Sequence, residues 1–350
     1  MTRGELVEAT GLSQPTITRA TTALLEAGLI QERADRTQNR GRGRPTVPLD
    51  VVDTPWMLAG IAVGTSSTYI GLYDTRGRVI KEDDVPTPVA RLREDDFLEH
   101  IVAGVHRLSV GVDRELVSVG VTTSGRVDDQ GLVHAPNLGW EGVDIAKRFR
   151  YHFDVPVVVS SAIPAILGSE TQGTKLHDDS TVLVFFADDS LGAALATKNG
   201  VEQVPLPEVA SEIFSDGDTE RSLATASVLD AVRSRGCSAE TIVEAADIVT
   251  QHGGAREVLD DRARLLGAVT ARLNEEYRPD RIVLAGSAFI DDKRAPKIFV
   301  NALRDLAGKD LVAELRLIPT HREVVKAIAR AVALDPLLRV PLSLHKVQPE

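Results

Sequence analysis

The chain has 350 residues, of which 43% are hydrophobic and 26% are charged, a balance typical of a soluble globular protein with two or three domains. No apolar run approaches the roughly 20 residues that span a bilayer and no secretory signal opens the chain, so we expect a cytoplasmic protein without membrane contact. Cys237 is the single cysteine, which excludes a disulfide framework and a zinc site built from several thiolates.

The charge is divided unevenly along the chain. The net charge of -11 argues at first sight against nucleic-acid binding, but residues 1–50 hold seven arginines against six acidic residues. The rest of the chain holds 33 basic and 45 acidic residues. A nearly neutral head on an acidic body suits a small DNA-binding domain carried by a body that DNA repels.

The first 33 residues predict two short helices and the start of a strand. Gly11 suits a tight turn between the helices, because glycine adopts a positive φ at little cost. Ser13 is a favourable N-cap for the second helix, Pro15 is tolerated in its first turn, and Gly28 ends it. Apolar residues at helical spacing give each helix an apolar side: Leu6, Val7 and Ala9 in the first, and Ile17, Ala20, Leu24 and Leu25 in the second.

Two helices joined by a short turn with glycine form a helix-turn-helix unit, whose second helix presents its first residues to base edges in the major groove. Gln14 suits adenine, and Arg19 suits guanine or a phosphate. An ordinary helical hairpin with a solvated polar face is the alternative. The residues predicted to contact DNA from this unit are Ser13, Gln14, Thr16, Thr18, Arg19 and Thr22.

The stretch after Ile30, "QERADRTQNRGRGRP", predicts a hairpin wing with an arginine-rich tip. Arg40, Arg42 and Arg44 are spaced by glycines, a pattern that suits contact with the phosphate backbone or entry into a narrow minor groove. The alternative is a flexible basic linker without a binding role. With contact to three phosphates, DNA binding would depend strongly on salt.

Two stretches of the head, "TGLSQPTITRATTALLEAGLI" and "GRGRPTVPL", resemble the winged helix-turn-helix of the ROK family (repressors, open reading frames, kinases). The helix that normally precedes these two in the family is missing. We therefore expect either a truncated start or a minimal form of this domain.

From Trp56 onward, predicted strands alternate with helical segments, which indicates α/β layers and a cleft between two lobes. The predicted strands lie in "MLAGIAVGTSSTYIGLYDTRGRVI", "LVSVGVTTSG", "VPVVVSS", "STVLVFFADDSLGAALATKNG" and "PDRIVLAGSAF". Their order, and above all residues 120–145, "GVTTSGRVDDQGLVHAPNLGWEGVDI", resemble the ROK sugar kinase-like body, an actin-like ATPase fold.

The resemblance covers nearly the whole chain and implies an α/β protein with an N-terminal winged helix-turn-helix and a two-lobed body. The expected organisation is a DNA-binding domain over 1–48, a linker over 49–56, a first lobe over 57–165, a second lobe over 166–338 with its C-terminal helix returning to the first, and a tail over 339–350.

The positions at which ROK kinases carry their chemistry are altered. Ala62 stands where the phosphate-and-metal turn has aspartate, and Ser161 stands where the catalytic base has aspartate. The second phosphate loop reads "ADDSLG", whose Asp188 and Asp189 repel a triphosphate. In the zinc segment, "ASEIFSD", Glu212 is kept, Ser215 replaces histidine and no cysteine cluster follows. Phosphoryl transfer needs a metal site and a base, so we expect no catalytic residue, no metal and no cofactor.

A DNA-binding head on an inactive kinase-like body resembles a ROK transcriptional regulator, more specifically a repressor. The resemblance implies a near-palindromic double-stranded operator, a homodimer or tetramer, and a sugar or sugar phosphate as effector. Asn137, Ser161 and Glu212 are the candidate ligand contacts, although Ile163 and Pro164 make this lining more apolar. Two alternatives stay open: a body that serves only for dimerisation, and a residual ATP-dependent sugar kinase.

Overall fold

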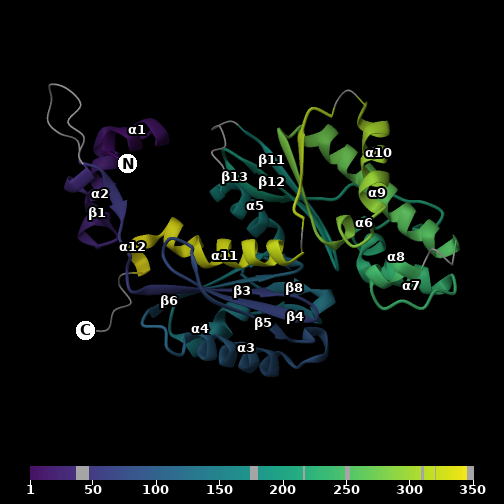
Figure 1. Cartoon of the computed structure of the whole chain (residues 1–350), viewed down its shortest axis with the longest axis horizontal. Coiled ribbons are helices and arrows are strands. Elements are labelled where there is room, and N and C mark those ends of the chain that lie inside the picture. Colours follow the sequence, from purple (N-terminus) through teal and green to yellow (C-terminus); the bar gives the residue numbers. More distant parts are fainter. Residues whose placement is uncertain are drawn as a thin grey trace.

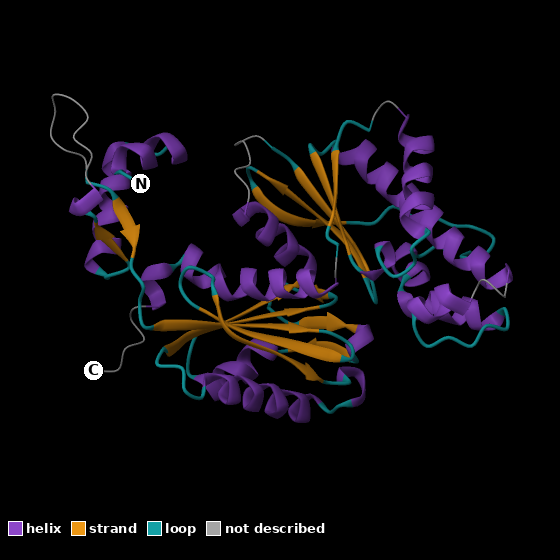
Figure 2. Cartoon of the chain, viewed as in Figure 1, coloured by secondary structure: helices purple, strands orange, loops and turns teal. Residues whose placement is uncertain are grey.

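The computed structural model describes residues 1–36, 47–173, 180–215, 217–248, 253–308, 311–319 and 321–344. A small head at the N-terminal end is followed by two α/β lobes, each built on a five-stranded sheet (Figures 1 and 2). The predicted α/β fold class is confirmed. Among the described helices, none combines the length and apolarity needed to cross a bilayer.

The head contains the predicted helix-turn-helix. Helix α1 (Arg3–Thr10) is followed by Gly11, whose φ of 65° confirms the predicted turn glycine, and by helix α2 (Gln14–Glu26). The Ser13 side chain caps α2 by accepting a hydrogen bond from the Thr16 amide. Strands β1 (Ile30–Glu32) and β2 (Leu49–Val51) then pair antiparallel, as a wing hairpin requires.

Two features of the head differ from the sequence-based expectation. Ala9 and Ala20 are both exposed, and Thr21 is buried instead of Ala20. A hydroxyl is tolerated there because the Thr21 Oγ1 donates to the Ile17 carbonyl at 2.8 Å and accepts from the Arg3 Nε at 3.1 Å. Strand β2 occupies residues expected to be linker, so the hairpin reaches Val51.

The first lobe is a mixed sheet in the order β10-β6-β3-β4-β5. Its strands β3 to β6 and β10 span Trp56–Val63, Ser67–Tyr73, Val79–Pro86, Glu115–Thr123 and Val157–Ser161. Helices α3 (Glu94–Ser109) and α4 (Ile145–Phe153) cover one face, and α11 (His321–Arg339) covers the other (Figure 1). A small sheet of β7 (Arg126–Val127), β8 (Val133–Ala135) and β9 (Trp140–Val143) extends from β6.

Glycines let α11 lie directly against this sheet. Gly60 and Gly120 are register partners on β3 and β6. A Cβ at Gly60 would lie 2.1 Å from the Ala329 carbonyl oxygen, and one at Gly120 would lie 2.4 Å from the Val332 carbonyl. Since real side chains do not approach so closely, any larger residue would force α11 away from the strands.

The second lobe has the sheet order β13-β12-β11-β14-β15. Its strands β11 to β15 span Val182–Ala187, Leu191–Thr197, Gly200–Val204, Arg281–Ala285 and Glu314–Leu317. Helix α5 (Ala162–Gly173) and α11 lie on the face toward the first lobe, and the remaining helices pack on the other face (Figure 1). These helices, α6 to α10, span Thr219–Leu223, Thr225–Ser234, Ile242–Ile248, Gly253–Tyr277 and Ala295–Ala307.

Helix α11 also contacts the head. Its Leu334 belongs to a buried cluster with Leu29 of the head, Trp56 of the first lobe and Leu344 of helix α12 (Pro341–Leu344). Near its other end, Ile328 packs between the two lobes. One helix therefore contacts the inter-lobe region and the head.

Candidate DNA-binding surface and inter-lobe cleft

The exposed face of α2 carries most of the residues predicted to contact DNA. Gln14, Thr18, Arg19 and Thr22 are exposed, and so is the cap residue Ser13. Thr16 is only half-buried, and its hydroxyl lies 2.9 Å from the Ser13 hydroxyl. The five exposed side chains are thus accessible to a partner, while Thr16 supports the cap; their contacts with bases and phosphates stay a prediction.

Two arginines of the basic segment are ion-paired within the head. Arg33 lies 2.6 Å from Asp35 and 3.4 Å from Asp50, and Arg36 also lies 3.4 Å from Asp50. The hydrogen bond from Arg33 lowers the pKa of Asp35 to about 2, so this carboxylate is charged at neutral pH. The predicted phosphate contacts at Arg40, Arg42 and Arg44 lie outside the described residues.

A cleft of about 670 Å³ separates the two lobes. Its lining includes Ala62 at the end of β3, Thr65 in the turn that follows, and Asp188 and Asp189 in the turn between β11 and β12. Ala62 is 4% exposed and packs in an apolar cluster with Tyr69 and Ile163. The position therefore offers a methyl group inside a packed core and no oxygen that could hold a metal.

Two residues of this cleft, Thr65 and Ser287, already donate hydrogen bonds to the chain's own carboxylates. The Thr65 hydroxyl of the first lobe donates to Asp189 of the second at 2.5 Å. Asp188 accepts from the Ser287 backbone amide at 3.2 Å and from its hydroxyl at 2.7 Å. A phosphate at these donors would displace a carboxylate and meet its negative charge.

A buried cation lies behind these carboxylates. Arg262 of α9 is 3% exposed, and its guanidinium donates to the Leu223 carbonyl at 3.0 Å and to the Asp188 carbonyl at 3.5 Å. Burial lowers the pKa of Arg262 to about 10, against the attraction of Asp188, Asp189 and Asp291. It therefore remains charged at neutral pH and compensates the acidic turn.

The hydroxyl of Ser161, at the end of β10, also makes its hydrogen bonds within the chain. It donates to the Gly125 carbonyl at 2.7 Å and accepts from the Gln203 amide nitrogen of the second lobe at 3.1 Å. A serine hydroxyl lacks the basicity that proton abstraction from a sugar requires, and these bonds already use its proton and one of its two lone pairs. Gln203 was not foreseen, because nothing in the sequence connects a residue of β13 to Ser161.

The three predicted ligand contacts do not share one cavity. Asn137 lines the large cleft, and its Oδ1 accepts from the Ser124 hydroxyl at 3.0 Å. Its buried Nδ2 has no partner among the described residues. Ser161 lines a second, smaller cavity, whereas Glu212 is exposed in the loop before α6 and lines neither. A ligand contact at each of these positions stays a prediction.

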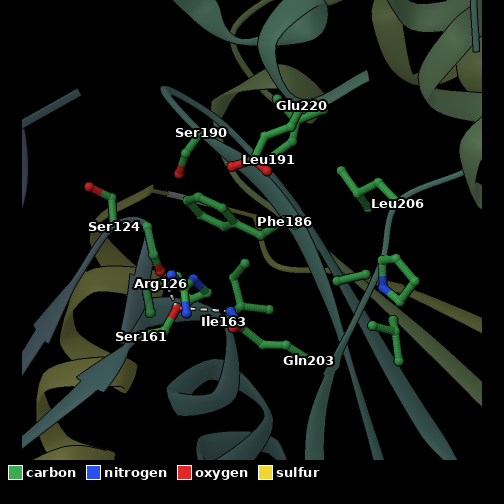
Figure 3. Close-up of a pocket in the computed structure, with 16 residues that line it drawn as sticks. Ser124, Arg126, Ser161, Ile163, Phe186, Ser190, Leu191, Gln203, Leu206 and Glu220 are labelled. Atoms are coloured by element: carbon green, nitrogen blue, oxygen red, sulfur yellow. Dashed lines mark hydrogen bonds between the residues drawn. The ribbon is translucent and has the colours of Figure 1, made fainter. Parts of the chain in front are cut away.

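The second cavity lies beside Ser161 and has a volume of about 270 Å³. Residues of both lobes line it, and Ser124 belongs to both cavities (Figure 3). Ile163 fills the space next to Gly192, where a Cβ would lie 2.3 Å from the Ile163 Cδ1. This isoleucine stands where the family resemblance implies asparagine, so it replaces a polar wall with an apolar one.

Residues 58–201 match the family described as the ROK family. A transcriptional regulator of Mycobacterium tuberculosis is 31% identical over 367 residues, covering 97% of this chain and 83% of that protein. The chain belongs to the ROK family. The DNA-binding transcriptional dual regulator NagC of Escherichia coli is 24% identical, covering 94% of this chain and 88% of that protein.

Solved ROK structures share the fold. A ROK family transcriptional regulator, a homolog of the E. coli MLC protein, superposes with a TM-score of 0.76 at 18% identity and covers 99% of this chain and 95% of that one. A ROK glucokinase from Streptomyces griseus, solved with glucose and AMPPNP, gives 0.64 at 17% identity and covers 80% and 99%. The predicted ROK sugar kinase-like body, an actin-like ATPase fold, is confirmed.

Proposed function

We propose that this ROK protein is a DNA-binding transcriptional regulator, acting as a repressor, whose body has lost phosphoryl transfer. The observation that carries the proposal is the pairing of an exposed helix-turn-helix face with a cleft that lacks kinase chemistry. The exposed Gln14 and Arg19 suit base and phosphate contacts. Ala62 and Ser161 provide neither a metal ligand nor a base.

The relatives support this function. The M. tuberculosis and E. coli relatives carry the names of transcriptional regulators, and a relative from Bacillus subtilis is named a xylose repressor. We expect this chain to bind as a homodimer or tetramer to a near-palindromic operator, because two-fold symmetric proteins present two equivalent heads.

The packing of α11 gives the body a direct contact with the head. Arg322 and Ile328 of this helix line the large cleft, while Leu334 packs with Leu29 of the head. A ligand that binds one arrangement of the lobes better than another would shift the populations of both arrangements. Carried through α11, this shift would change how the two heads are presented to the operator.

The alternative function is a residual sugar kinase, which the fold also accommodates. We expect purified protein with Mg²⁺, ATP and a panel of hexoses to form no sugar phosphate above the rate without protein. Ser161→Ala serves as the matched variant, because it removes the hydroxyl at the position of the base. Hexose-dependent turnover by the wild type that this substitution abolishes would establish a kinase and overturn the proposal.

A further inference from the structure

The smaller cavity is amphipathic, with polar and apolar groups on different sides. Its walls include the side chains of Ile163, Phe186, Leu191 and Leu206. Ser124, Ser190 and Arg126 lie on one side of Phe186 in Figure 3, and Leu206 lies on the other. An apolar wall opposite a few polar groups is typical of sites for small organic ligands.

Two of the hydroxyls that line this cavity are already engaged with other parts of the chain. The Ser161 hydroxyl bonds to Gly125 and Gln203, and the Ser124 hydroxyl donates to Asn137. A hexose would bring several hydroxyls against Ile163, Leu191 and Leu206, where they would lose their bonds to water without gaining partners. Each such loss costs free energy, so this apolar wall disfavours a sugar.

Arg126 is the cationic side chain in the lining of this cavity. It is exposed in β7, and no carboxylate of the described residues lies within ion-pair distance of its guanidinium. A guanidinium without a partner is a good donor for a carboxylate, which it can bind through two parallel hydrogen bonds. The one acidic residue in the lining, Glu220, lies on the far side of Phe186 from Arg126 (Figure 3).

We propose that the cavity binds a small carboxylic acid with a compact aliphatic body. The carboxylate faces Arg126, and the aliphatic part lies against Ile163, Leu191 and Leu206. A cavity of about 150 Å³ accommodates benzene, so one of 270 Å³ suits a ligand of roughly ten non-hydrogen atoms. This inference rests on the proposed function, in which the body of a regulator senses a ligand, and it names the chemical class of that ligand.

The test measures binding to the full chain by calorimetry, with four probes built on a six-membered ring. Cyclohexanecarboxylate has the proposed chemistry, cyclohexylmethanol lacks the charge, cyclohexylmethylamine reverses it, and glucose carries hydroxyls instead of the aliphatic surface. We expect the acid to bind, and the alcohol and the amine to bind at least ~10-fold more weakly, because they lack the charge-assisted hydrogen bonds.

Two variants test the two ends of the site. Arg126→Ala removes the charge and should weaken acid binding ~10-fold or more. Leu206→Asp places a carboxylate on the apolar wall and should abolish acid binding. Arg304→Ala, at an exposed position of α10 far from both cavities in the fold, is the matched control and should leave acid binding unchanged.

Equal binding of the acid to wild type and Arg126→Ala would overturn the proposed orientation. Binding of glucose but not of the acid would overturn the ligand class while leaving a ligand-sensing body in place. No binding of the acid up to ~10 mM, a concentration that corresponds to a very weak complex, would overturn the inference. Operator binding is measured without any of these ligands, so the proposed function fails or stands independently.

Discussion

Replacing Arg40, Arg42 and Arg44 together by alanine is expected to weaken operator binding roughly 30- to 300-fold at near-physiological salt. Each arginine that neutralises a phosphate releases condensed counterions, so the slope of log K against log salt should also become less negative by about 3. Fluorescence anisotropy with a labelled operator, measured over a salt series, gives both quantities.

The control for this variant is a set of three arginines on the body, Arg91, Arg233 and Arg304, which are exposed. Their joint replacement by alanine makes the same change in net charge and should leave the salt slope of operator binding unchanged. An unaltered affinity and slope in the head variant would show that "GRGRP" is a linker without a binding role.

The second large effect is expected at Arg262, the buried cation beneath the acidic turn. Arg262→Met keeps much of the side chain's volume but leaves Asp188, Asp189 and Asp291 without their compensating charge. Removing one partner of a buried ion pair typically lowers the free energy of unfolding by about 3–5 kcal/mol. Urea denaturation of the whole chain, monitored by circular dichroism, should show the unfolding transition of the variant at a lower urea concentration than that of the wild type.

Arg264→Met is the matched control on the same helix. The Arg264 side chain is 54% exposed and lies 3.2 Å from Asp261, and an exposed ion pair contributes less than about 1 kcal/mol. If Arg262→Met shifted the transition no more than Arg264→Met, the buried guanidinium would not be needed to compensate the turn.

Local signals in the sequence predicted the head and most of the strands well. Ser13, Gly11 and Gly28 act through their own backbone or their nearest neighbours, so a cap and two turns can be read from single residues. Most strands of the two main sheets were predicted because they show as apolar runs bounded by turns. Strands β5, β13 and β15 were not predicted, because few of their residues are buried. Thr21 was missed because its burial depends on a contact with Arg3, 18 residues away.

The details of the cleft depend on contacts between distant parts of the chain. Altered residues such as Ala62 and Ser161 could be recognised by comparison with the family pattern. Ser161 accepts a hydrogen bond from Gln203, 42 residues away, and Asp188 accepts one from Ser287, 99 residues away. Neither partner has a local signature, because tertiary folding alone brings them together. The separation of the cleft into a large and a small cavity likewise required the structure.

Selection from random-sequence duplex DNA with the purified chain, at near-physiological salt, tests most directly whether this protein reads DNA. We predict enrichment of a near-palindromic motif with half-sites about one or two helical turns apart, as expected for two heads related by two-fold symmetry. A pool without any enriched motif would contradict the assignment of a sequence-reading regulator.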